Sequence, residues 1–487
     1  MTETLQAHSA AILTAGNAPA GSNTNEIPLC VDLDGTLLRT DMLHEGMARL
    51  LARPWLLLVA AFQLLRGRAA LKHWLAAHVP LDPALLPYRQ DVLTWLRQQK
   101  QRGRRLVLAT GADQSLAHAV AAHLGIFDEV LASDGYVNLT GRAKADRLVT
   151  EFGQGHFDYV GDSETDRPVW AAARRAIRVE PAAGASKLKA VVKALRVRQW
   201  VKNILVFIPL VTSHNWFSAT ALAHAAAAFF ALSLCASAIY VVNDLLDLDS
   251  DRRHATKRRR PFAAGTLSIP AGIAAIPLLL AASALVSAFL PSGARILLGV
   301  YLIATTAYSF YIKRKLLVDV FTLSLLYTLR VVLGGAATGV ECSPWLLGFS
   351  IFLFMSLAFC KRAAELFNLR AQNREGVAGR DYFVWDLSEL NMFGVAAGYL
   401  AAIVLALYIH SPEVRLLYKS PEWLWAMVPI VVYWVSRIWI VASRGAMNED
   451  PIVFATRDRV TYLCAAIGAA CLLLATTGVI RIPGVAA

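Results

Sequence analysis

The chain has few charged residues and few cysteines for its length. Only 17% of its 487 residues are Asp, Glu, Lys or Arg, whereas 56% are hydrophobic and the mean hydropathy is +0.47. Ordinary soluble domains carry about 25% charged residues, so this composition argues against a wholly soluble chain and indicates a membrane protein with a soluble part. The six cysteines include no CxxC pair and fall mostly in apolar runs, where we interpret them as small buried hydrophobic residues.

Acidic residues are also scarce relative to basic ones, 35 against 48, which gives a formal net charge of +13. Such an excess can indicate a nucleic-acid partner. Here, however, the cations lie in short loops between apolar runs, which is typical of the cytoplasmic loops of membrane proteins. We therefore expect membrane lipid as a partner and no nucleic acid.

The pattern along the chain changes near residues 181–197. Before this point short apolar strands alternate with helical stretches, and after it apolar runs of membrane length dominate. We predict a disordered tail at 1–26, a soluble α/β domain at 27–180, a linker with a basic surface helix at 181–197, and an all-α membrane bundle at 198–487.

The membrane half contains nine candidate transmembrane helices, since each run approaches the ~20 residues needed to cross a bilayer. They lie at about 201–216, 219–242, 268–290, 294–312, 316–340, 345–360, 390–410, 422–441 and 460–481. Lys and Arg concentrate in alternate loops, on the side of the soluble domain. The positive-inside rule then predicts a multi-pass protein of the bacterial inner (plasma) membrane, with the soluble domain and the polar clusters facing the cytoplasm.

Four polar motifs follow predicted strands of the soluble half. They are Asp32-Leu-Asp34-Gly-Thr, Thr110-Gly, an isolated Lys144, and Asp162 with Asp166. In this order they resemble the motifs of the haloacid dehalogenase phosphohydrolase superfamily. The resemblance implies a Rossmann-like α/β domain with a helical cap at about 41–90, and a site at the carboxyl ends of its parallel strands.

The same resemblance assigns roles to these residues. Asp32 would be the nucleophile that forms an aspartyl-phosphate, and Asp34 the general acid and base. One Mg²⁺ would be held by Asp32, the backbone carbonyl of Asp34 and Asp162, with support from Asp166. The residues that would bind the phosphoryl oxygens are Thr110 and Lys144.

The expected cap is unusually apolar, with runs at 55–62 and 71–75. Such a cap could close on a lipid-linked substrate or touch the bilayer. An ordinary cap core explains the same pattern, and the sequence leaves both interpretations open.

An acidic segment lies between two long apolar runs of the membrane half. Asn243, Asp247 and Asp251 are spaced four apart, which on a helix puts three Mg²⁺ ligands on one face. A charge at the bilayer centre costs at least about 2.5–3.5 kcal/mol, so the segment must lie at a membrane surface or in a wet cavity. Asp249 lies off this face, and we expect it to be solvated. We expect Asp319 and Arg330, inside a later run, to face a cavity.

This segment resembles the first Asp-rich motif of the UbiA-type intramembrane prenyltransferases, which have nine transmembrane helices. The closer resemblance is to one branch, the decaprenyl-phosphate phosphoribosyltransferases. It is carried by Arg198-Gln-Trp-Val-Lys202-Asn, by NDxxDxxxDRxH from Asn243, and by Lys361-Arg362-xx-Glu365. No second DxxxD motif follows Lys361, which favours a sugar diphosphate over a prenyl diphosphate as substrate.

The resemblance implies that the substrates are phosphoribosyl pyrophosphate (PRPP) and a polyprenyl phosphate. The lipid phosphate would attack the anomeric carbon and displace pyrophosphate, assisted by one or two Mg²⁺ on Asn243, Asp247 and Asp251. A phosphate nucleophile is already anionic, so no general base is required. The candidate phosphate contacts are Lys202, Lys257, Arg260, Lys313, Lys361 and Arg362.

The fusion suggests a bifunctional enzyme in which the phosphatase removes the 5-phosphate from the lipid-linked product. The result would be polyprenyl-phosphoryl ribose, a precursor of ribose or arabinose donors for envelope or glycan synthesis. Two alternatives remain: an aromatic prenyltransferase that uses polyprenyl diphosphate, with an independent phosphatase, and a non-enzymatic lipid-phosphate transporter or scaffold. Polyprenyl chain length, the phosphatase substrate and the oligomeric state stay open.

Overall fold

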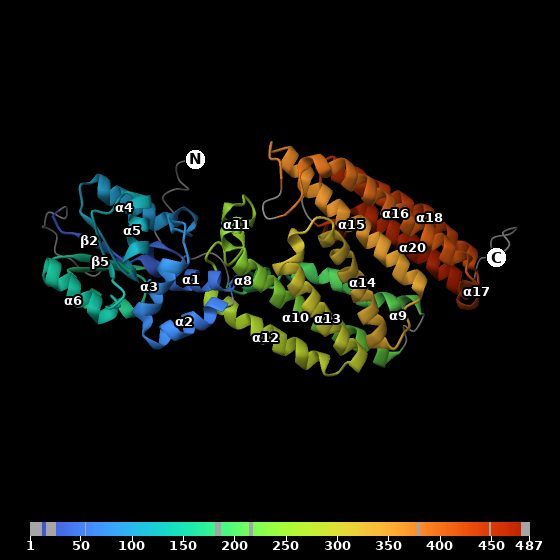
Figure 1. The fold of residues 1–487 in the computed structure, drawn as a ribbon, viewed down its shortest axis with the longest axis horizontal. Helices are drawn as coiled ribbons and strands as arrows, with labels where there is room; N and C mark the ends of the chain where they lie inside the picture. Colours follow the sequence, from blue (N-terminus) through green and yellow to red (C-terminus); the bar gives the residue numbers. More distant parts are fainter. Residues whose placement is uncertain are drawn as a thin grey trace. The chain divides into compact units, whose positions relative to one another are not determined.

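The computed structural model describes residues 12–15, 26–53, 55–180, 187–213, 218–376, 380–447 and 450–478 (Figure 1). The chain forms two compact units. The first comprises Met1–Leu195 with Tyr240–Pro277, and the second comprises Arg196–Ile239 with Leu278–Ala487. The Asp-rich segment of the membrane half therefore belongs to the same compact unit as the soluble domain.

The first unit is built on a six-stranded sheet with the order β1-β6-β5-β2-β3-β4. All neighbouring strands are parallel except β1, which pairs with β6 in antiparallel fashion. The strands are β1 Ile12–Ala15, β2 Leu29–Val31, β3 Leu106–Asp113, β4 Glu129–Ser133, β5 Asp158–Gly161 and β6 Arg175–Val179. Because the chain runs from β2 outward in both directions, the carboxyl end of β2 is the switch point where such sheets bind ligands. The predicted α/β class is confirmed.

Helices cover both faces of this sheet. Leu29 and Val31 of β2 belong to one buried cluster, together with side chains of α4 (Gln90–Gln101) and α5 (Gln114–Leu124). Cys30 points to the opposite face and belongs to a second cluster, with side chains of α6 (Gly141–Phe152) and α7 (Arg167–Ala172). Successive side chains of a strand point to opposite faces of the sheet. Because both faces are buried here, the sequence of β2 is a continuous apolar run.

Three of the four α-helices between β2 and β3 lie where the sequence predicts a cap. They are α1 Met42–Leu50, α2 Trp55–Leu65 and α3 Arg68–His78. Their shared core includes Leu50, Ala60, Leu71 and Leu75. The side chain of Asp41 caps α1 by accepting hydrogen bonds from the backbone N–H groups of Leu43 and His44.

The predicted disordered tail (1–26) and the predicted linker with its surface helix (181–197) are only partly described. Residues 12–15, inside the expected tail at 1–26, form strand β1 against β6. The other residues of that tail before 26, and residues 181–186 of the expected linker, lie outside the described residues. The linker continues as α8 (Lys187–Ala194), at the position predicted for a basic surface helix.

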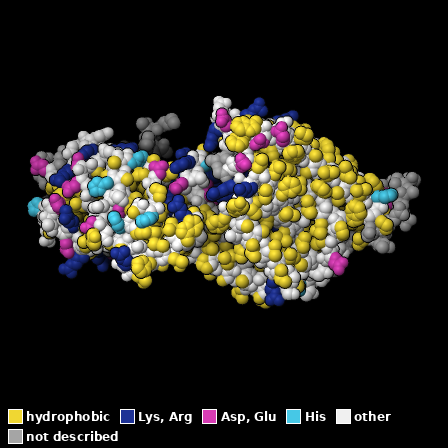
Figure 2. Space-filling model, in the orientation of Figure 1, with side chains coloured by type: hydrophobic (Ala, Val, Ile, Leu, Met, Phe, Trp, Pro, Cys, Tyr) yellow, Lys and Arg dark blue, Asp and Glu magenta, His cyan; other side chains and the backbone are white. Residues whose placement is uncertain are grey.

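The described residues contain eight helices long and apolar enough to span a membrane, so the predicted count of nine is not confirmed. The eight are α10 Ala219–Leu246, α12 Ile269–Ser287, α13 Ser292–Phe310, α14 Val318–Thr338, α15 Pro344–Arg370, the span Val384–His410 that includes α16 (Leu387–His410), the span Pro421–Ser443 that includes α18 (Met427–Ser443), and α20 Arg459–Thr477. Shorter helices accompany them: α11 Leu248–Arg253, α17 Pro412–Leu417 and α19 Pro451–Ala455. On the face drawn in Figure 2, hydrophobic side chains cover most of the second unit.

The predicted span that is not among these eight is the first, expected at 201–216. Its described part folds as a 3₁₀ helix, Val197–Phe207, and the five-residue helix α9, Ile208–Thr212. Lys202 and Asn203 are buried there in polar contacts with other elements of the second unit. A fully lipid-facing helix would deny these groups their partners, so this side of the segment packs against the bundle, whereas Ile204 and Val211 are exposed.

Candidate active sites

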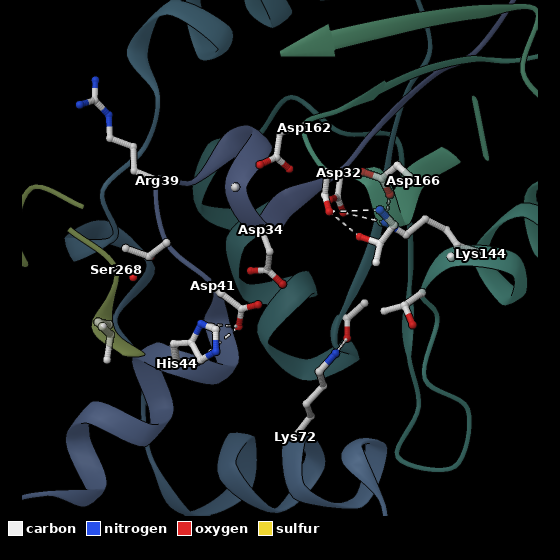
Figure 3. Close-up of a pocket in the computed structure, with 18 residues that line it drawn as sticks. Asp32, Asp34, Arg39, Asp41, His44, Lys72, Lys144, Asp162, Asp166 and Ser268 are labelled. Carbon is white, nitrogen blue, oxygen red and sulfur yellow. Dashed lines mark hydrogen bonds and ion pairs between the residues drawn. The ribbon is translucent and has the colours of Figure 1, made fainter. Parts of the chain in front are cut away.

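A cavity of about 350 Å³ lies at the carboxyl end of the sheet (Figure 3). Five of the six residues predicted for the phosphatase site line it: Asp32, Asp34, Lys144, Asp162 and Asp166. Asp32 directly follows β2 and Asp162 directly follows β5, whereas Lys144 comes from α6. The parallel pairing of β2 with β5 brings the first two motifs together, although 130 residues separate them in the sequence.

The sixth residue, Thr110, is not among the residues that line the cavity. Its side chain is fully buried, and its hydroxyl oxygen accepts a hydrogen bond from the backbone N–H of Ala112. The next residue, Gly111, lines the cavity instead. The predicted contact of Thr110 with phosphate therefore remains a prediction.

Three carboxylates of the cavity are arranged as a metal site would require. Ligand atoms of Asp32, Asp162 and Asp166 lie within 4.8 Å of one another. Asp166 Oδ2 is buried and has no hydrogen-bond partner in the described part of the chain, which leaves an oxygen for a cation. Gly35 has φ +77°, and a Cβ there would lie 2.3 Å from Asp162 Oδ2, so a glycine keeps the backbone close to the carboxylates. Hard oxygen ligands of this kind suit Mg²⁺.

Lys144 is the cation that contacts these carboxylates. Its Nζ lies 2.8 Å from Asp32 Oδ1 and 3.4 Å from Asp166 Oδ1, and it donates a hydrogen bond to Tyr159 Oη at 2.8 Å. Burial by itself would lower the pKa of Lys144, but the two carboxylates outweigh it and raise the pKa above its usual value. The ammonium group therefore stays charged beside Asp32, where it can neutralise a bound phosphoryl group.

The two aspartates of the DxDGT motif differ in their electrostatics. Burial raises the pKa of Asp32 to about 6, against the opposing effect of Lys144. Burial, reinforced by the charges of Asp41 and Asp32, raises the pKa of Asp34 well above its usual value. Asp34 Oδ1 accepts a hydrogen bond from the backbone N–H of Met42, which orients the group. A carboxyl group kept protonated beside a carboxylate nucleophile suits a general acid.

Sequence reasoning missed several residues of the cavity wall. Lys72 of α3 donates hydrogen bonds to the Gly111 carbonyl oxygen at 2.5 Å and to Asn138 Oδ1 at 2.9 Å. The only indication in the sequence was that Lys72 is a basic residue within the segment predicted to form the cap. Ser268 and Ile269, at the start of the membrane helix α12, also line the cavity, and no motif marked them. Further wall residues that no motif marked come from the segment that leads into α1 and from α1 itself: Arg39, Thr40, Asp41 and His44.

The Asp-rich segment keeps its three predicted ligands in helical register. α10 ends at Leu246 and α11 begins at Leu248. Across this break the N–H of Asp247 donates to the Asn243 carbonyl oxygen at 2.9 Å, and the N–H of Asp251 to that of Asp247 at 2.8 Å. Asn243 Oδ1 is buried and has no partner among the described residues, so the segment also offers an oxygen to a metal ion.

Arg260 contacts the acidic residues of this segment. Its Nη1 lies 2.7 Å from Asp251 Oδ2 and 3.2 Å from Asp244 Oδ1. Burial raises the pKa of Asp251 to about 6, although Arg260 acts in the opposite direction. The arginine predicted to bind phosphate is thus held beside the predicted metal ligands. Lys257 is exposed in a 3₁₀ turn that follows the motif.

Asp249 keeps a partly exposed side chain, 43% of it accessible, and it also forms an ion pair with Arg49 of α1, which was not expected. Arg49 Nε donates to Asp249 Oδ2 at 3.2 Å. Helical periodicity predicts that Asp249 lies off the face shared by Asn243, Asp247 and Asp251. It does not predict an ion pair with Arg49, because that residue lies 200 positions earlier in the chain.

The second unit brings two predicted phosphate contacts together. Lys202 Nζ and Lys361 Nζ lie 2.8 and 3.1 Å from the same atom, Asp450 Oδ2. Burial would raise the pKa of Asp450, but the two lysines hold it well below its usual range. A single carboxylate thus positions two cations that come from distant parts of the sequence. Lys313 lies elsewhere in this unit, half-buried in the 3₁₀ turn Ile312–Arg314.

Arg362 is fully buried and pairs with side chains of the bundle. Its guanidinium group contacts Asp319 at 2.6 Å, Glu365 at 2.7 Å and the Tyr308 hydroxyl at 3.0 Å. The polar residue expected to face a cavity, Asp319, therefore joins a packed network with Arg362. Arg330 is likewise buried, and donates to Asn203 Oδ1 and to the Tyr301 hydroxyl.

Family comparisons match each half of the chain to a different description. Residues 204–457 match the UbiA prenyltransferase family, and residues 29–171 match haloacid dehalogenase-like hydrolases. The protein y4nM of Sinorhizobium fredii is 36% identical over 471 residues, which cover 92% of this chain and 91% of that protein. A decaprenyl-phosphate phosphoribosyltransferase of Mycobacterium tuberculosis is 33% identical, over 58% of this chain and 92% of that enzyme.

Among solved structures, a UbiA homologue from Archaeoglobus fulgidus bound to GPP and Mg²⁺ is similar at 16% identity and a TM-score of 0.45. The match covers 58% of this chain and 99% of that one.

Proposed function

Since the chain belongs to the UbiA prenyltransferase family, is a multi-pass membrane protein and carries a haloacid dehalogenase-like domain, we propose that it is a bifunctional enzyme of lipid-linked pentose synthesis. The membrane domain transfers 5-phosphoribosyl from PRPP to a polyprenyl phosphate and releases pyrophosphate. The soluble domain then hydrolyses the 5-phosphate of this product. Mg²⁺ serves both sites, and both face the cytoplasm at the inner membrane of a bacterium.

The hydrolysis uses the residues of the cavity. Asp32 attacks phosphorus while Asp34 protonates the departing sugar oxygen, so the P–O5 bond breaks as the aspartyl-phosphate forms. Water, deprotonated by Asp34, then releases inorganic phosphate and restores Asp32. Lys144 neutralises the phosphoryl oxygens throughout. Asp32, Asp162 and Asp166 would hold Mg²⁺, which would supply the charge neutralisation that a carboxylate needs to approach a phosphate dianion.

The transfer relies on binding and orientation more than on acid–base chemistry. An oxygen of the lipid phosphate forms the new bond to the anomeric carbon, as the bond from that carbon to pyrophosphate breaks. Asn243, Asp247 and Asp251 would hold Mg²⁺, which would supply stabilisation of the leaving pyrophosphate. Lys202 and Lys361, aligned by Asp450, provide a paired positive charge for a phosphate group.

One observation supports the pairing of the two reactions most directly: the Asp-rich segment and the phosphatase cavity belong to one compact unit. Ser268 and Ile269, which follow that segment at the start of a membrane helix, form part of the cavity wall. A cavity built partly from a membrane helix suits a phosphate carried on a lipid. The similarity of the membrane half to a named decaprenyl-phosphate phosphoribosyltransferase supports the choice of substrates.

Mass spectrometry of lipids tests the proposal. The wild-type protein in membranes, given Mg²⁺, PRPP and decaprenyl phosphate, should form decaprenyl-phosphoryl ribose. Asp32→Asn should stop at the 5-phosphorylated lipid, and Asp247→Asn should form neither. Identical products from wild type and Asp32→Asn would contradict the coupled phosphatase. Turnover of polyprenyl diphosphate with an aromatic acid, and none of PRPP, would favour the aromatic prenyltransferase.

A further inference from the structure

The second cap helix, α2, presents a stripe of large hydrophobic side chains to the surface. Trp55, Leu58, Phe62 and Leu65 recur every three or four residues, which places them on one helical face. Their exposed fractions are 65, 79, 60 and 87%. The apolar cap sequence left open whether these residues form a core, and such exposure excludes that explanation for this face.

The opposite face of α2 supplies what the fold of the cap requires. Ala60 is buried in the cap core, and Leu56 and Leu57 pack against it. The core partners are provided by α1 and α3, through residues such as Leu50 and Leu71. The core of the cap is therefore complete without the outer stripe. Exposure of four large apolar side chains to water is unfavourable in free energy.

Charge around the stripe is of one sign. Helix α2 contains no Asp or Glu. Exposed arginines flank it, with Arg53 before the helix and Arg66 and Arg68 after it. Aromatic and leucine side chains on one face with cations at the ends are the pattern of helices that lie in the lipid–water interface, where the cations meet anionic headgroups.

From this we infer that α2 docks the phosphatase cap onto the surface of an anionic lipid bilayer. The protein is already anchored by its spanning helices, so insertion of α2 pays no cost for bringing a separate molecule to the membrane. The docked helix packs on α1 and α3, which carry His44 and Lys72 to the wall of the phosphatase cavity. Docking thus holds the cap side of that cavity at the membrane surface. The inference does not depend on which phosphate the site hydrolyses.

Quenching of a fluorophore tests the docking in the full-length protein. Cys342 and Cys464, the cysteines that are not fully buried, are first replaced by serine, and the unlabelled parent serves as blank. Single labels are then placed by Leu58→Cys on the stripe and by His118→Cys on α5, an exposed site of the α/β domain. The protein is reconstituted into nanodiscs of phosphatidylcholine and phosphatidylglycerol in equal parts, with doxyl-labelled lipid as one quencher and iodide as the other.

The label at position 58 should be quenched severalfold more by doxyl lipid than the label at position 118, and less by iodide. Adding Arg53→Glu and Arg66→Glu should reduce this lipid quenching, and so should nanodiscs of phosphatidylcholine alone. Equal iodide quenching at both positions would show the stripe to be in water and overturn the inference. Protection of position 58 from both quenchers would show that another protein surface, such as a second copy, covers it, and would overturn the inference as well.

Discussion

Glu45 of the phosphatase cap and Arg252 of the Asp-rich segment form a buried, two-pronged ion pair. Arg252 Nη2 lies 2.6 Å from Glu45 Oε1, and its Nη1 lies 2.9 Å from Oε2. The Glu45 side chain is fully buried and that of Arg252 nearly so. Arg49 contacts the same carboxylate at 2.9 Å and reaches Asp249 on its other side. This network ties the cap helix α1 to α11, the helix that contains the predicted metal ligand Asp251.

Removing Glu45 should destabilise the first unit strongly. Glu45→Ala leaves Arg252 buried without its counter-ion, a change that typically costs about 3–5 kcal/mol. We expect a lower melting temperature by differential scanning calorimetry of the protein in detergent. Glu151→Ala is the matched control, because Glu151 pairs with Arg147 on the exposed surface of α6 and should change stability by about 1 kcal/mol or less. A Glu45→Ala protein as stable as this control would contradict the importance of the pair.

The same pair predicts a dependence of stability on pH. Burial would raise the pKa of Glu45, but the hydrogen bonds and charges of Arg252 and Arg49 dominate and lower it below its ordinary value of 4.5. A carboxyl group with a depressed pKa stabilises the fold above its unfolded pKa, and this contribution is lost as the pH falls through its folded pKa.

Melting temperatures measured downward from neutral pH should therefore fall more steeply below about pH 4.5 for wild type than for Glu45→Gln. The comparison with Glu45→Gln isolates this residue from other carboxylates that titrate in the same range. Parallel curves for the two proteins would exclude Glu45 as a source of the acid sensitivity.

Asp34→Asn should separate the two halves of the phosphatase reaction. With p-nitrophenyl phosphate the leaving group needs no proton, so Asp32 can still be phosphorylated. Hydrolysis of the aspartyl-phosphate needs the base at position 34, and turnover should fall by about 10²–10⁴-fold. Rapid mixing should show a burst of about one p-nitrophenolate per protein. Asp32→Asn is the control and should show neither burst nor turnover, and a burst there would contradict its role as nucleophile.

Two neighbouring aspartates should differ in their effect on transfer. Asp251→Asn removes a predicted metal ligand and should lower formation of the lipid-linked sugar phosphate by about 10–100-fold or more at limiting Mg²⁺. Asp249→Asn breaks only a partly exposed ion pair with Arg49 and should leave transfer nearly unchanged. Radiolabelled PRPP and thin-layer chromatography measure both. Equal losses would place the metal site elsewhere.

Lys361 and Arg362 should likewise separate function from stability. Arg362→Met breaks a buried network with Asp319 and Glu365 and should lower the melting temperature, consistent with a loss of about 3–5 kcal/mol. Lys361 is more exposed, and its partner Asp450 keeps Lys202. Lys361→Met should therefore retain the melting temperature and raise the KM for PRPP. The reverse pattern would reassign the phosphate contact to Arg362.

Some features could be predicted because they depend on residues close in sequence. The DxDGT turn, the four-residue spacing from Asn243 to Asp251, and the long apolar helices express local periodicity, which depends little on the rest of the chain. The first expected span, at 201–216, is the one that the described residues do not confirm. Its mean hydropathy is high because of its Leu and Val residues. The segment also holds Lys202 and Asn203, whose hydrogen-bond partners lie far along the chain.

The sequence by itself determined the two-domain composition, the phosphatase motifs and the face shared by the three predicted metal ligands, because each is a short-range pattern. Only the tertiary structure decided that Arg252 pairs with Glu45 and that Lys202 and Lys361 share Asp450. It also decided that α2 exposes its stripe of large hydrophobic side chains. The physical reason is burial: a charged or apolar side chain is stable only with the surroundings that the fold brings to it, and these come from distant segments. In the sequence Arg252 and Glu45 resemble surface charges, whereas in the fold both side chains are removed from water.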